Sequence, residues 1–178
     1  MSKKEGYYEK AKKEMRLSER ILAAMPGFRG YKEKELRRES DRLIRDHLHR
    51  RLMEAKGDLK NVFQKLSDLR LFEVLTDMDR LIAKFDRVTA KIDHASYGYA
   101  GFFNIVKVEE ANLDSMIDFD NQLIDDVEKI VDHVENLKTQ VVKQENVKAK
   151  EPIRLLVETL EALEKAFDKR SEVILRVS

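Results

Sequence analysis

The sequence contains no cysteine and no tryptophan, and its 178 residues include only two prolines and six glycines. The absence of cysteine excludes disulfide bonds and thiolate-bound metal sites. The scarcity of proline and glycine disfavours a fold built from many short strands, because such a fold needs frequent turns. Long helices need few of these residues, so the composition favours an all-α protein.

Long apolar runs are also missing. No stretch approaches the ~18 apolar residues of a membrane-spanning helix. Residues Met1 to Gly6 are not followed by the apolar stretch of a signal peptide. We therefore expect a cytoplasmic protein.

Apolar residues recur at helical spacing in a chain of which 39% is charged. The pattern predicts helices over about 3–25, 31–69, 73–94 and 109–141, and a last helix beginning at Pro152. In most of these helices the apolar residues follow one another at alternating intervals of three and four positions, as in coiled coils. The predicted fold is all-α, an elongated antiparallel helical bundle or coiled coil of three to five long helices. Residues 1–178 would form a single domain, although 1–25 could be a separate N-terminal amphipathic helix. No repeat at a period of 20–50 residues is visible, which argues against a solenoid.

The breaks between these helices differ in clarity. Pro26 and Gly27 stop the first helix. The join at 69–76 has neither glycine nor proline, but the apolar spacing slips there. We favour a bend or short loop with Thr76 as helix N-cap, and a single unbroken helix is the alternative. Gly57 marks either a kink or a tolerated exposed site.

Charge is divided unevenly along the chain. Residues 1–56 hold 17 Lys/Arg and 10 Asp/Glu, a net charge of +7, whereas residues 108–147 hold 3 and 11, a net charge of −8. The acidic helix could pack beside the basic N-terminal region and so select one bundle topology. Alternatively, the basic residues could form a surface for nucleic acid or an anionic membrane. The candidate anion contacts are Lys12, Lys13, Arg37, Arg38, Arg42 and Arg45.

Motifs for catalysis, cofactors and metals are not found. The glycine-containing turns match no phosphate-binding spacing, and no nucleophile motif surrounds a serine. A di-metal site in a bundle needs two Glu-x-x-His pairs, and only Asp46 with His49 approaches one. His47 and His49 stand among arginines, so we expect both on a solvated helix face. We expect neither an enzyme nor a cofactor or metal site.

The acidic residues between Glu109 and Asp126 are expected on a solvated face, because a calcium loop needs a glycine and fixed ligand spacing. Asp120 differs from the rest. It falls in the same 3–4 series as Leu123 and Val127, so it should face a helix interface. A carboxylate buried there needs a partner, and we expect an arginine or lysine from the basic N-terminal half.

An aromatic segment lies between the predicted third and fourth helices. Tyr97, Tyr99, Phe102 and Phe103 surround two glycines there. The segment is either an aromatic-packed corner joining two helices or a contact patch for a partner protein. Together with the run from Pro26 to Glu35, it resembles segments of small helical prokaryotic proteins of unknown function. That resemblance covers about the first two-thirds of the chain and implies no activity or site.

The order of a basic helical hairpin and an acidic helix is similar to the architecture of membrane-remodelling scaffold proteins. The leading functional hypothesis is a non-enzymatic helical scaffold or adaptor that binds other proteins, itself included. A helix over 31–71 would span roughly 60 Å, so we expect part of its apolar stripe to need a second molecule. The alternative hypothesis is binding of nucleic acid or an anionic membrane through the basic N-terminal helices.

Overall fold

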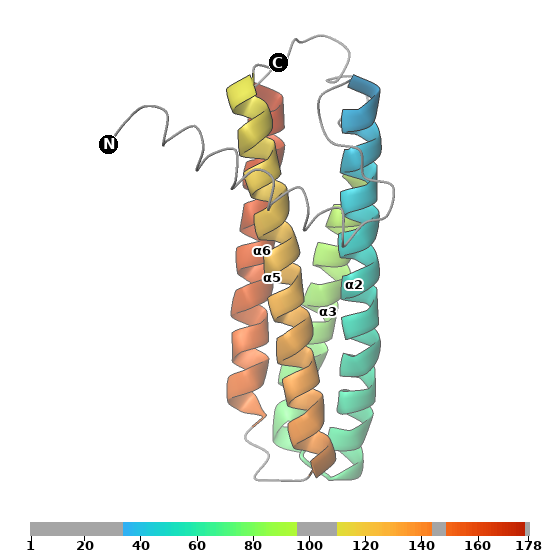
Figure 1. Cartoon of the computed structure of the whole chain (residues 1–178). Helices are drawn as coiled ribbons and strands as arrows, with labels where there is room; N and C mark the ends of the chain where they lie inside the picture. The colour runs from blue at the N-terminus through green and yellow to red at the C-terminus, as the bar shows by residue number, and fades with distance from the viewer. Residues whose placement is uncertain (1–33, 96–109, 144–148, 177–178) are drawn as a thin grey trace, which may run out of the picture.

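The computed structural model describes residues 34–95, 110–143 and 149–176. Almost all of them lie in four long helices, which run side by side along one elongated bundle (Figure 1). These helices are α2 (Lys34–Asp68), α3 (Phe72–His94), α5 (Glu110–Lys143) and α6 (Lys150–Arg176). The all-α prediction is confirmed for this part of the chain. The predicted helix over 3–25 lies outside the described residues.

The helices form two antiparallel hairpins, α2–α3 and α5–α6, which lie side by side. Successive ion pairs between α3 and α6 join residues whose numbers increase in the same direction, as in Lys84–Glu161 and Lys91–Asp168. Thus α3 runs parallel to α6, and α2 runs parallel to α5 in the same way. Each helix packs against two others, and α3 and α5 occupy diagonal corners of the bundle. The connection over 96–109 therefore joins diagonal corners at one end.

The core consists of regularly spaced layers of apolar side chains from all four helices. Each core residue of the first hairpin from Leu48 onward has a counterpart 75 positions later in the second, as with Leu52 and Val127 or Val88 and Leu163. The Lys56–Asp86 ion pair places Ala55 and Phe85 at about the same level. A small side chain in α2 therefore accompanies a large one in α3, which helps the layer to fill without strain.

The heptad positions of α2 are buried within this single chain. From Ile44 to Leu66 the core side chains of α2 are at most 3% exposed. Burial of such a stripe is the main source of stability for a long helix. The expectation that part of the α2 stripe needs a second molecule is therefore wrong for this stretch, because α3 and α5 cover it.

A short turn separates α2 from α3. Arg70 has a φ of 56°. The amide N of Leu71 donates to the carbonyl oxygen of Leu66 at 3.0 Å, and that of Arg70 donates to Ser67 at 2.9 Å. These two hydrogen bonds define a Schellman motif with Arg70 in the left-handed position that usually holds glycine. The predicted loop is confirmed, and the alternative of one unbroken helix is wrong.

Other local predictions can now be checked against the helix bounds. Thr76 is not an N-cap, because α3 begins at Phe72, four residues earlier, immediately after the Schellman turn. Pro152 lies in the first turn of α6 as predicted. Gly57 is exposed, and a side chain there would meet open space, so it is a tolerated surface site. Among the described helices, none combines the length and hydrophobicity needed to span a membrane.

Candidate functional site

Three charged side chains are buried at the end of the bundle where α2 and α5 begin. We call this end the polar end and define it by these residues, Arg45, Asp120 and Arg170. Asp120 on α5 is 0% exposed, and Arg170 on α6 is 1% exposed. The Nε of Arg170 donates to Oδ1 of Asp120, and its Nη2 donates to Oδ2 at 3.3 Å. This two-point pairing satisfies a carboxylate that would be costly to bury alone.

Arg45 on α2 links this helix to α3 at the polar end. Its side chain is 7% exposed, and its Nη1 donates to the backbone carbonyl of Asp93 at 3.5 Å. The prediction that Asp120 faces a helix interface with a cationic partner is confirmed. Its partner comes from α6 and not from the basic N-terminal half as expected. The reason is topological, because α6 ends beside the start of α5.

A second polar cluster lies between α2 and α5, just below the polar end. Arg51 donates to Glu128 from Nε at 2.8 Å and from Nη2 at 2.5 Å. The hydrogen bond from Arg51 lowers the pKa of Glu128, and the bond to Glu128 raises the pKa of Arg51. Further down, Lys138 pairs with Asp58 at 3.0 Å. The prediction that the acidic helix packs beside the basic region is confirmed by the Arg51–Glu128 pair.

His47 belongs to this second cluster and is only 8% exposed. Burial, and then the positive charge of Arg50, lower the pKa of His47, although Glu128 opposes the shift. The prediction that His47 lies on a solvated face is therefore wrong, because the side chain lies on the side of α2 that faces α5. His49 is partly exposed and stands 4.0 Å from the carboxylate of Asp93. Among the described residues, no group of three or more potential ligands could hold a metal ion.

The acidic tract of α5 is only partly solvated. Asp118 is exposed as predicted, but Asp126 is 9% exposed and pairs with Lys129 at 2.9 Å. Asn121 is also buried, with 6% exposed. The expectation of a solvated face is wrong for Asp126, because α5 is buried on more than its core face near the polar end.

The predicted partner-contact residues are described only in part. Arg42 has a 78% exposed side chain and lies 3.6 Å from Asp46. Arg45 is buried, so its assignment as a surface anion contact is wrong. The remaining candidates lie outside the described side chains: Lys12, Lys13, Arg37, Arg38, Tyr97, Tyr99, Phe102 and Phe103.

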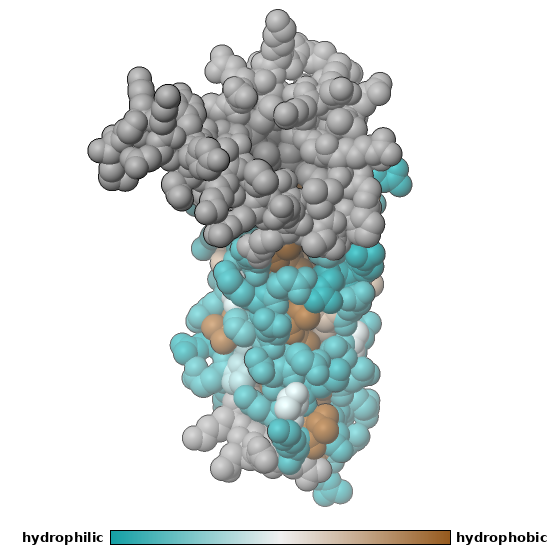
Figure 2. All heavy atoms as spheres, viewed as in Figure 1, coloured by the Kyte–Doolittle hydropathy of each residue, from teal (hydrophilic) through white to brown (hydrophobic). Residues whose placement is uncertain are grey.

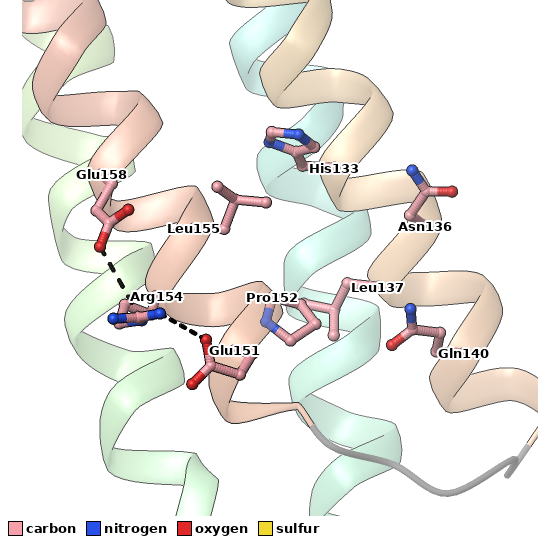
Figure 3. Close-up of a pocket in the computed structure, with 9 residues that line it drawn as sticks. All are labelled: His133, Asn136, Leu137, Gln140, Glu151, Pro152, Arg154, Leu155 and Glu158. Carbon is pink, nitrogen blue, oxygen red and sulfur yellow. Dashed lines mark hydrogen bonds and ion pairs between the residues drawn. The ribbon is translucent and has the colours of Figure 1, made fainter.

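A groove of about 410 Å³ runs between α5 and α6 toward the opposite end (Figure 3). Leu137, Pro152 and Leu155 give it an apolar lining, and His133 lies above them. Arg154, on the outer side of α6, is engaged by Glu151 at 2.7 Å and Glu158 at 4.0 Å. The charged residues that line the groove thus pair with each other.

Exposed large apolar side chains are scattered over the described surface. They are Met53, Phe72, Val142 and Leu155. Figure 2 shows the visible described face as mostly hydrophilic, with separate apolar patches. None of these four residues lies at the polar end.

No family model matches this chain, and no curated protein or solved structure is significantly similar to it. The resemblance to small helical prokaryotic proteins therefore stays a prediction. Sequence reasoning found Asp120 but missed Arg170, because the apolar series of the last helix continues from Phe167 to Ile174 and the charged Arg170 between them was not recognised as a core position.

Proposed function

We propose that this protein is a non-enzymatic helical adaptor that binds a protein partner at the polar end of its bundle. The observation that supports it is the place of the aromatic connection. Because α3 ends and α5 begins at the polar end, on diagonal corners, the bundle holds both ends of the segment with Tyr97, Tyr99, Phe102 and Phe103 there. Aromatic side chains supply much of the binding energy at protein interfaces.

The bundle itself supports this role as a rigid holder. Its four helices cover one another along their heptad positions, and ion pairs tie α2 to α5 and α3 to α6. Such a frame holds His94 and Glu110, the helix ends that flank the aromatic segment, in fixed positions. Binding to a second copy is one form of this proposal, and a cytoplasmic location is part of it.

The test compares three full-length tagged proteins in cross-linked pull-downs from native lysate: the wild type, a Tyr99→Ser/Phe102→Ser variant, and Phe72→Ser as matched control. Phe72 is 63% exposed at the opposite end. We expect a partner that wild type and control retain and that the double variant loses, with unchanged melting temperatures. Sedimentation equilibrium of the same proteins identifies a second copy as that partner. An identical set of bound proteins, and identical self-association, in all three would refute the proposal.

A further inference from the structure

The α2–α5 face is buried near the polar end and exposed further down. Asn121, on the outer flank of α5, is 6% exposed, whereas Val142, three heptads below at the same heptad position, is 63% exposed. On α2, His47 is 8% exposed, whereas Glu54, one heptad below, has a 56% exposed side chain. The four helices have the same neighbours along this face, so an additional element is needed to cover its upper part.

We call the covered upper part of this face, with His47, Asn121 and Ile124, the upper α2–α5 groove. Its chemistry fits an amphipathic basic helix. Ile124, 9% exposed, adds an apolar side chain beside the core positions of α5 that already pack inside the bundle. The ion pair of Arg51 with Glu128 closes the groove below. Around it, α5 has only acidic charges from Glu110 to Glu128. The apolar Ile124 beside this acidic flank of α5 favours a partner with one apolar stripe and a positive flank that faces α5, while Arg50 stands beside His47 on the α2 side.

A segment with this sequence pattern precedes α2 in the chain. Residues 3–25 have apolar residues at helical spacing: Tyr8, Ala11, Met15, Leu22 and Met25. The same stretch holds seven lysines and arginines against four glutamates. Because α2 begins at the polar end, residues 3–25 are tethered close to the groove, which gives them a high effective concentration there.

We propose that residues 3–25 dock as an amphipathic helix in the upper α2–α5 groove of their own chain, over His47, Asn121 and Ile124. The apolar stripe covers the groove floor, and the basic flanks face the acid-rich start of α5. This docking is independent of the proposed adaptor function, because it concerns a different face and a different segment.

The test uses paramagnetic relaxation in the full chain, which is convenient because the protein has no cysteine. A nitroxide is attached at Lys13→Cys, on the polar side of the 3–25 pattern. We expect most of the amide signal of Asn121 and Ile124 to be lost, and the signals of Val142 and Leu155 to be kept. Met15→Asp in the labelled protein should restore the lost signals, whereas the matched change Glu9→Gln, away from the apolar stripe, should not.

Two outcomes would overturn the docking. Unchanged signals at Asn121 and Ile124 in the labelled protein would mean that another segment covers the groove. Loss of those signals when labelled, NMR-silent protein is mixed with unlabelled, NMR-visible protein would mean that the segment docks on a second copy. Neither outcome affects the pull-down with the aromatic variants, so the two proposals can fail separately.

Discussion

At the scale of single residues, the main feature of the polar end is the buried ion pair between Asp120 and Arg170. Asp120 could be recognised from the sequence because it interrupts an apolar 3–4 series. Its partner could not, since the heptad pattern gives the buried face of each helix but not which helices meet. Both charges are buried almost completely, so each depends on the other to offset its desolvation.

We predict that Asp120→Ala and Arg170→Met each lower the free energy of unfolding by about 3 to 5 kcal/mol, because each leaves a buried charge without its counter-charge. The double variant Asp120→Ala/Arg170→Met removes both charges and should lose clearly less than the sum of the two single losses. Urea denaturation of the four proteins gives the coupling energy between the two residues. Additive losses in the double variant would contradict the pairing.

At the scale of elements, the turn between α2 and α3 shows why its sequence was hard to interpret. A left-handed residue after a helix is usually glycine, and here it is Arg70. The change in the spacing of apolar residues predicted a turn between the two helices. No residue type in the sequence indicated at which position the first helix ends. The predicted segment 73–94 nearly matches α3, but the N-cap was predicted at Thr76, inside the helix that begins at Phe72. Helix ends without glycine or proline are set by backbone hydrogen bonds that the side chains do not reveal.

Arg70→Gly should raise the free energy of unfolding by about 1 kcal/mol, because an L-residue in the left-handed region is strained and glycine is not. The comparison is Arg80→Gly, in the middle of α3, which should lower it by about 1 kcal/mol. Thermal denaturation of both variants checks the opposite signs. Destabilisation by both would mean that Arg70 is not left-handed in solution.

The facing sides of α2 and α5 should make stability depend on pH in two steps. The pKa of His47 lies below its ordinary 6.5, so the unfolded chain takes up a proton first, and stability is lost as the pH falls below about 6.5. The pKa of Glu128 lies below its ordinary 4.5, so its contribution is present above about 4.5 and is lost as the pH falls through the lower folded value.

Urea denaturation at a series of pH values measures both steps. His47→Gln should remove the contribution of the upper step and leave the lower one, and Glu128→Gln should reduce the lower one. His94→Gln serves as control for the upper step, because His94 has a 73% exposed side chain. A pH dependence that is unchanged in His47→Gln would contradict the burial of that side chain.

At the scale of the whole molecule, the sequence predicted the helices and their buried faces but not their arrangement. The core residues Leu123 and Val127 were predicted correctly from their spacing. All four helices share the same heptad pattern, however, so many pairings satisfy it equally well. The choice depends on ion pairs between distant residues, such as Arg51–Glu128 and Lys84–Glu161, and on the length of the diagonal connection.

The central structural claim is that α2 and α5 are parallel neighbours within one chain. Pulsed electron paramagnetic resonance on two doubly labelled proteins tests it directly: Asn61→Cys/Thr139→Cys and Asn61→Cys/Gln122→Cys. All three sites are exposed. Thr139 lies at about the level of Asn61, whereas Gln122 lies about 25 Å further along α5 at 1.5 Å per residue. We predict a short distance for the first pair and a clearly longer one for the second, whereas the reverse order would contradict the parallel arrangement.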